Sequence, residues 1–399
     1  MHTMTATYAV DEQQLINLCS ALVAQPSLPG HEDGVAGVIR NELTKHDFDD
    51  VSVDSFGNVI AIRRAERSRG TILFDGHMDT VSPGNHDFWS NDPYQTVLNQ
   101  ELLMGRGVAD MKGSIAAMIL GIAAVPRSSL TADVVLSCSV CEEAVEGVAL
   151  GRVLDRYPAD IVVIGESTEC ELAIGQRGRG ELLVETFGTA AHSSTPHLGV
   201  NAVKQMATVI ERLSRIEQPY HPVLGHGVME VTDVKSNPYP GLSVIPEHCA
   251  ATFDRRLLVE ETEESLLASL EPALNEVRAE ISSLDVRISI PSTDVTTYPG
   301  TPLVAPKFSP AWLFASDHPA VEAGLAALSQ AGLQTVTRTY SFCTNGSESA
   351  GRRGIPTIGF GPGSEEQAHR VDECLPVEQL VRAANGYAAL AAGLAEGIR

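Results

Sequence analysis

The sequence predicts an α/β protein with a mostly parallel sheet covered by helices and an inserted, ferredoxin-like α+β domain. Early in the chain, short apolar runs without polar alternation are separated by helical segments, which is typical of strands buried on both faces. A run of strict apolar–polar alternation follows at 179–187, and α/β character returns after residue 316. A chain of 399 residues is also long enough for two domains.

The first part of the chain alternates between predicted helices and strands. Residues 11–24 and 31–46 have the apolar spacing of helices, and the almost wholly apolar segment 111–125 is expected to be a buried helix. The apolar runs that predict strands are 58–63, 71–76, 132–140 and 160–164.

Residues 178–294 are expected to form the inserted domain. The strand at 179–187 is followed by a helix, two strands, a helix and a strand, at 199–215, 227–234, 248–258, 260–281 and 285–290. This order, β-α-β-β-α-β, is that of a ferredoxin-like sandwich. We therefore assign 1–177 and 295–399 to one discontinuous domain.

The chain returns to that domain through 291–316, which contains five prolines and is predicted to be a linker. The remaining elements are predicted helices at 317–331 and 376–396 and predicted strands at 334–340 and 356–360. No internal repeat interrupts this pattern.

Charge and composition exclude several classes of function. With 28 Lys plus Arg against 51 Asp plus Glu, the net charge is −23, which disfavours nucleic acid and anionic membranes as partners. No stretch approaches the ~20 apolar residues of a membrane span. The N-terminal MHTMTATYAVDEQQ lacks a basic region followed by an apolar run, so we expect no signal peptide.

The cysteines predict a reducing environment. There are seven, an odd number, and they are scattered, which favours free thiols and a cytoplasmic location. Cys138 and Cys141 form a C-x-x-C pair. Because the pair lies in an apolar strand-like run, we interpret it as core packing rather than a redox or zinc motif.

Metal-ligand residue types gather at the ends of predicted strands. They are His77 after 71–76, Glu142 and Glu143 after 132–140, Glu166 after 160–164 and His369 after 356–360, with Asp110 before the helix 111–125. Ligands of open α/β sheets bind at the carboxyl ends of strands. Each residue alone could be a loop charge or a helix cap, but together they offer the oxygen and nitrogen ligands that divalent ions prefer.

The chemistry of the set indicates cations and a general base. Several carboxylates packed together have raised pKa values unless cations compensate their charge. The adjacent Glu142 and Glu143 allow one carboxylate to bind metal while the other transfers a proton. Asp79, two residues after His77, is placed to accept the second ring N–H of that histidine.

The motifs in this order resemble the zinc-dependent family of acetylornithine deacetylase, succinyl-diaminopimelate desuccinylase, aminoacylase and glutamate carboxypeptidase. The resemblance covers essentially the whole chain. It rests on G-H-x-D-T-V (76–81), G-R-G-x-x-D-M-K-G (105–113), E-E (142–143), G-E-x-T (165–168) and G-P-G…A-H-x-x-x-E (361–373).

The resemblance implies a centre of two divalent ions, zinc in the first place, with cobalt or manganese as alternatives. One ion would be held by His77, Asp110 and Glu166. The other would be held by Asp110, Glu143 and His369, so that Asp110 bridges the two.

The resemblance also assigns the catalytic groups around that centre. Glu142 would be the general base, with a contribution of typically ~10²–10⁴ in rate, and Asp79 would orient His77. The family further implies a cis peptide bond between Asp110 and Met111.

The insert resembles the lid and dimerisation domain of the same family. His192 would stabilise the oxyanion in the active site of a partner subunit, which implies a homodimer. Arg256 and Arg177 align with arginines that bind a substrate carboxylate, a role suited to guanidinium, although either could be an ordinary ion-pair partner. Ser243 departs from the family, which commonly has Asn there.

Three functions remain open from the sequence. The first is hydrolysis of an amide in a small N-acyl amino acid. The two arginines favour a substrate with a carboxylate, and hence deacylation or cleavage of a carboxyl-terminal dipeptide. The second is a dipeptidase or aminopeptidase with the same metal core. The third is a binding protein with a vestigial site, which is disfavoured because every core position carries a competent residue.

Overall fold

The structure is a computed structural model that describes residues 8 and 10–398. Most of the N-terminal segment on which the signal-peptide expectation rests lies outside these residues. The chain divides into two compact units. One comprises residues up to Gln176, Asp294–Val304 and residues from Trp312 onward; the other comprises Arg177–Thr293 and Ala305–Ala311.

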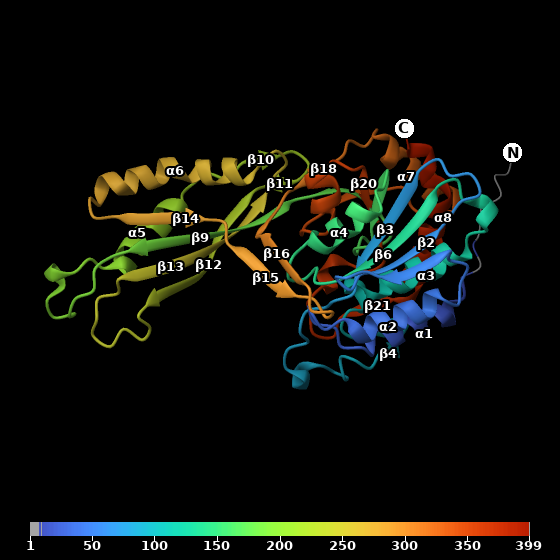
Figure 1. The fold of residues 1–399 in the computed structure, drawn as a ribbon, viewed down its shortest axis with the longest axis horizontal. Helices are drawn as coiled ribbons and strands as arrows, with labels where there is room; N and C mark the ends of the chain where they lie inside the picture. The colour runs from blue at the N-terminus through green and yellow to red at the C-terminus, as the bar shows by residue number, and fades with distance from the viewer. Residues whose placement is uncertain (1–7, 9, 399) are drawn as a thin grey trace. The chain divides into compact units, whose positions relative to one another are not determined.

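The first unit contains a large sheet in the order β1-β2-β6-β3-β7-β20-β8-β18, with β19 paired to β8 (Figure 1). In chain order the strands are β1 (Asp50–Val53), β2 (Val59–Arg63), β3 (Thr71–His77), β6 (Asp133–Ser139), β7 (Ile161–Ile164), β8 (Leu172–Gln176), β18 (Trp312–Leu313), β19 (Thr337–Tyr340) and β20 (Thr357–Gly359). A smaller sheet joins β4 (Val97–Asn99), β5 (Leu102–Met104) and β21 (Cys374–Pro376).

The large sheet is mixed rather than mostly parallel. Its centre follows the expectation, because β3 is parallel to both β6 and β7, and β7 is parallel to β20. The outer pairs β1–β2, β2–β6, β20–β8 and β8–β18 are antiparallel. The sequence analysis did not predict β8 and β18, which extend the sheet at one side of its parallel centre.

Helices cover both faces of this sheet. They are α1 (Glu12–Val23), α2 (Asp33–Leu43), α3 (Gly113–Ala124), α4 (Val148–Arg156), α7 (Pro319–Gln330) and α8 (Val377–Gly393). Ile72 and Phe74 of β3 belong to the main core, which includes residues of α1, α3 and α8. Leu73 between them packs in a separate cluster with α4. The strand is therefore buried on both sides, as its lack of polar alternation predicts.

The second unit is an antiparallel sheet with two helices. Its main strands are β9 (Gly178–Phe187), β12 (Val228–Asn237), β13 (His248–Leu257) and β14 (Asp285–Ser289), in the order β12-β13-β9-β14. The helices are α5 (Ala202–Leu213) and α6 (Glu263–Glu280), and a hairpin of β10 (Tyr220–His221) and β11 (Gly225–His226) precedes β12. The inward residues of β9 and β13 share one core with α5 and α6, which is a ferredoxin-like arrangement.

The boundaries of this unit differ from the predicted 178–294 by one residue at each end and by one further segment. Residues 305–311, expected in the discontinuous domain, belong to the second unit. The reason is β17 (Phe308–Ser309), which pairs antiparallel with Gly180 and Arg179 of β9. The ribbon of β15 (Ser292–Thr296) and β16 (Pro302–Pro306) occupies most of the stretch predicted to be a linker.

The described cysteines are free thiols, and Cys138 and Cys141 are both buried. Within the described residues, none of the helices combines the length and the apolar character needed to cross a membrane.

Candidate active site

The ends of the parallel strands bring the predicted residues together. His77 is the last residue of β3, Glu142 and Glu143 follow β6, and Glu166 is the second residue after β7. His369 lies in the segment between β20 and β21. Because β6, β3, β7 and β20 are parallel neighbours, their carboxyl ends meet at one edge of the sheet.

Asp110 reaches the same place from a tight turn at Val108–Lys112, directly before α3. The Asp110–Met111 peptide bond is cis, as the resemblance implied. The turn depends on its flanking glycines. Gly107 has φ +86, and a Cβ at Gly113 would lie 2.3 Å from the carbonyl oxygen of Val108.

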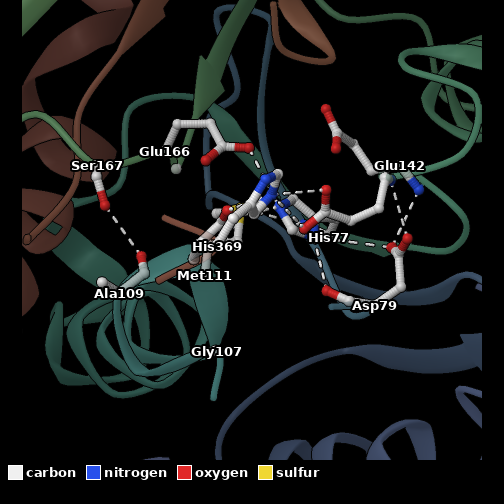
Figure 2. Close-up of polar contacts among 12 residues, drawn as sticks. His77, Asp79, Gly107, Ala109, Met111, Glu142, Glu166, Ser167 and His369 are labelled. Atoms are coloured by element: carbon white, nitrogen blue, oxygen red, sulfur yellow. Dashed lines mark hydrogen bonds and ion pairs between the residues drawn. The ribbon is translucent and has the colours of Figure 1, made fainter. Parts of the chain in front are cut away.

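The side chains form two groups that share Asp110. In the first, His77 Nε2 lies 3.0 Å from Asp110 Oδ1 and 3.3 Å from Glu166 Oε1. In the second, His369 Nε2 lies 3.0 Å from Glu143 Oε2 and 3.4 Å from Asp110 Oδ2. Each oxygen of Asp110 therefore serves one group. Figure 2 shows Glu166 directed toward His77.

Both groups fit a divalent cation. Within each group, the three ligand atoms lie within 4.8 Å of one another. Four ligands at about 2.0–2.2 Å from a tetrahedral zinc ion stand roughly 3.3–3.6 Å apart, close to the separations seen here. The donors are imidazole nitrogen and carboxylate oxygen, which suit zinc and neighbouring divalent ions.

The electrostatics of the cluster point to the same requirement. Burial, with a contribution from Asp110, raises the pKa of Glu166 to about 7. Burial lowers the pKa of His77, but Glu166 and Asp110 hold that pKa well above its usual value. Hydrogen bonds to Asp110 and Glu143 raise the pKa of His369 to about 10. The raised pKa values reflect an excess of negative charge at this place, which bound cations would compensate.

Glu142 belongs to neither ligand group but lies beside them. Its side chain is 6% exposed, and its pKa is raised well above the usual value by burial, opposed by nearby His77 and reinforced by Glu166. A buried carboxylate of raised proton affinity next to a candidate metal centre has the properties of a general base.

Asp79 makes a different set of contacts from those expected. Its carboxylate accepts hydrogen bonds from the amides of Glu142 (3.0 Å) and Glu143 (2.9 Å). His77 Nδ1 lies 2.9 Å from the backbone carbonyl of Asp79 and 3.7 Å from the carboxylate. Asp79 thus contacts His77 through its main chain, while its side chain holds the segment that carries Glu142 (Figure 2).

Glu373, the last residue of the A-H-x-x-x-E motif, was assigned no role from the sequence. This carboxylate is fully buried and accepts hydrogen bonds from Arg106 Nη1 and the amides of Gly107, Ala109 and Asp110, at 2.8–3.0 Å. It therefore fixes the turn that presents Asp110. Its place in the motif was the available signal, but the sequence does not show which amides it binds.

His192, Arg256 and Arg177 lie in the second unit. His192 is exposed, and its Nδ1 accepts hydrogen bonds from the amide and hydroxyl of Ser194. Arg256 pairs with Asp254 at 3.0 Å, and Arg177 donates to the carbonyl of His226.

Comparison with known proteins places these features in a family. The model of the family described as peptidase family M20/M25/M40 matches residues 73–393. The uncharacterized protein YgeY of Escherichia coli (strain K12) is 32% identical over 379 residues, covering 92% of this chain and 91% of YgeY. A succinyl-diaminopimelate desuccinylase of Sphingopyxis alaskensis is 29% identical over 284 residues, covering 66% of this chain and 73% of the enzyme.

Solved structures show the same fold. The aminopeptidase PepT of Bacillus cereus has a TM-score of 0.75 at 21% identity, covering 98% of this chain and 99% of PepT. The YXEP protein of Bacillus subtilis, described as a dinuclear metal binding peptidase, has a TM-score of 0.69 at 16% identity, covering 96% and 97% of the respective chains.

Proposed function

This chain belongs to peptidase family M20/M25/M40, and from that premise we propose that it is a di-zinc hydrolase of a small, carboxylate-bearing amide. Its class is a hydrolase acting on amide or peptide bonds. The observation that carries the proposal is the pair of three-residue ligand groups joined by Asp110, with the buried carboxylate of Glu142 beside them. The leading substrate class is an N-acyl amino acid.

The two ligand groups support an assignment of residues to the ions. His77, Asp110 and Glu166 would hold one, and Asp110, Glu143 and His369 the other. Zinc is the first choice, with cobalt or manganese as alternatives, because the donors are imidazole and carboxylate. The chemistry that two such ions supply when bound is polarisation of the scissile carbonyl and acidification of the attacking water.

Glu142 performs the proton transfers in this proposal. Its carboxylate accepts a proton from the water as the oxygen forms a bond to the carbonyl carbon. The same carboxyl group then donates that proton to the leaving nitrogen as the C–N bond breaks, so the amine departs neutral. Burial favours the uptake of the proton, because it raises the pKa of Glu142.

Arg256 and Arg177 are proposed to bind the substrate carboxylate. On β13 the neighbouring Arg255 is buried, with hydrogen bonds to Glu261 and Gln218. Arg256 projects to the opposite face of the strand and is partly exposed. Of the two adjacent arginines, Arg256 is therefore the one available to a ligand.

A substrate screen tests the proposed function. Zinc-loaded protein is incubated with N-acetyl, N-succinyl and N-carbamoyl amino acids and with dipeptides, and release of free amine is measured. Turnover of one acylated class above the dipeptides supports the proposal. Preference for dipeptides with a free amino group assigns the protein to dipeptidases or aminopeptidases instead. Absence of turnover with fewer than one bound ion per chain identifies a binding protein with a vestigial site.

His369→Ala is expected to remove one ion selectively. His369 contributes only to the group with Glu143, whereas the group of His77, Asp110 and Glu166 stays intact. Metal analysis of dialysed protein should therefore fall from two ions per chain toward one. The exposed His86 provides a matched control, since His86→Ala should keep both ions. Two retained ions in the His369 variant would remove this residue from the ligand set.

We propose that the protein acts as a cytoplasmic homodimer through its second unit, with His192 serving the partner's active site. Removal of one oxyanion donor costs about 10²–10³ in kcat, so His192→Ala should lower kcat by that factor and leave metal content unchanged. His197→Ala, an exposed histidine of the same segment, is the control. An unchanged kcat would make His192 a bystander, and a monomeric scattering mass would contradict the dimer.

A further inference from the structure

The loop between α1 and α2, residues 24–32, contacts the segments that carry the candidate active site. Ser27 Oγ donates to the carbonyl of Met78 at 2.8 Å, beside His77. Lys112, the last residue of the turn that presents Asp110, donates from Nζ to the carbonyl of Gln25 at 2.8 Å. The loop precedes the stretch 73–393 that matches the family model. Residues outside the part of the chain that matches the family model therefore hold the segments that carry the site.

Glu32 extends this support to the segment that carries Glu142. Its side chain is fully buried. Oε1 accepts hydrogen bonds from the amides of Gly30 (3.1 Å) and Cys141 (3.0 Å) and from the Cys141 thiol. Among the described residues, Oε2 has no hydrogen-bond partner. A carboxylate buried at such cost is unusual unless a specific contact depends on it.

The position of Glu32 strengthens this point. It is the N-cap residue of α2, where a side-chain oxygen usually accepts from an amide of the first turn. Its side chain makes no such capping bond. The carboxylate instead turns away from its own helix, toward Cys141. Capping therefore does not explain why a buried acid is present.

The segment held by Glu32 has a backbone conformation that needs restraint. Cys141 has φ +56, in the left-handed region that residues with a Cβ seldom adopt. The next two amides, of Glu142 and Glu143, donate to the carboxylate of Asp79. Three consecutive amides are thus held by two buried carboxylates, from two separate loops.

We propose that Glu32 is a positioning residue for the general base Glu142, acting through the amide of Cys141. The inference rests on the proposed function, in which Glu142 moves the proton. Glu32 sets the left-handed turn at Cys141, and this turn sets where the Glu142 side chain begins. Its oxygens contact Gly30 and Cys141 rather than the ligand groups, so its loss should change proton transfer more than metal binding.

Two volume-conserving substitutions separate the accepting oxygen from the charge. Glu32→Met and Glu32→Gln both remove the charge, but only glutamine keeps an oxygen that accepts from Cys141. We expect Glu32→Met to lower kcat by 10- to 100-fold, with KM changed by less than threefold and both ions retained. Misplacement of a reacting group by about 1 Å has an effect of that size. Glu32→Gln should restore kcat to within threefold of the wild type.

Controls keep the test decisive. Asp33→Asn alters the adjacent, exposed carboxylate and should leave kcat unchanged. If Glu32→Met gives no folded protein, Glu32→Asp replaces it. Aspartate keeps the charge, but its side chain is shorter and its oxygen no longer reaches the amide of Cys141. The Asp variant should lower kcat at least tenfold. A kcat equal to wild type in the folded Met or Asp variant, with only a lower melting temperature, would overturn the proposal. Absence of turnover in the wild-type protein would count against the proposed function alone. Hydrogen exchange of the Cys141 amide then tests the contact with Glu32, and this exchange should be faster in Glu32→Asp than in Glu32→Gln. Equal exchange in the two variants would overturn the positioning role of Glu32.

Discussion

Glu142→Gln should abolish most turnover while both metal ions stay bound. Glutamine has nearly the same size as glutamate but can neither accept the proton of the attacking water nor return it to the leaving nitrogen. A general base contributes typically ~10²–10⁴ in rate, so kcat should fall by about that factor. The ions should remain because Glu142 belongs to neither ligand group. The measurements are kcat on the best substrate of the screen and metal content after dialysis.

The adjacent residue provides the matched control. Glu143→Gln makes the same chemical change one residue away, in a carboxylate whose Oε2 lies 3.0 Å from His369 Nε2. This variant should lose one ion, and its activity should recover in part when metal is added in excess. Glu142→Gln should not recover. If added metal restored the Glu142 variant, that residue would be a ligand and the base would have to be sought elsewhere.

The candidate metal centre could be read from the sequence because it depends on a simple rule. Strands without polar alternation had to be buried, and buried parallel strands end at one edge. Polar residues at or just beyond the ends of such strands, as His77 and Glu166 are, then have to converge. The separation of His369 from His77 by almost three hundred residues is no obstacle, because β20 and β3 both pair with β7.

The supporting contacts could not be read in the same way. The carboxylate of Asp79 was expected to accept from His77, but the main-chain carbonyl of Asp79 lies closer to that ring. The carboxylate accepts from the amides of Glu142 and Glu143. Glu373 and Glu32 are also committed to backbone amides. Backbone donors leave no trace in residue type, so a sequence pattern cannot show which amide a buried carboxylate binds.

Some elements were missed although a signal existed. In α4, the buried Ala149, Leu150, Val153 and Leu154 recur at helical spacing, yet the helix was not predicted. It follows Gly147 directly, and that residue has φ +83. The buried Asn345 supports this start of the helix, because it donates to Asp75 and accepts from the amide of Gly147.

Asp110→Asn should have the largest effect on metal content, because one residue serves both ions. In the structure, Oδ1 faces His77 and Oδ2 faces His369. An asparagine keeps a single ligating oxygen, since its amide nitrogen carries two protons and does not bind cations. The variant should therefore hold at most one ion per chain. With one ion missing, kcat should fall by about 10³, because the ion's stabilisation of transition-state charge, worth several kcal/mol, is lost.

Thermal stability provides a readout of this prediction that does not depend on a substrate. A ligand that binds only the folded state stabilises it by RT ln(1 + [L]/Kd), about 2.7 kcal/mol at 100 times Kd. Zinc should thus raise the melting temperature of the wild type clearly and that of Asp110→Asn much less. The control is Asp372→Asn, whose carboxylate accepts from Ser90 rather than facing the ligand groups; it should respond to zinc like the wild type. An Asp110 variant that binds two ions and melts like the zinc-loaded wild type would show that no residue bridges the two groups. Each ion would then bind independently of the other, and His369→Ala should leave an enzyme that is active with one ion.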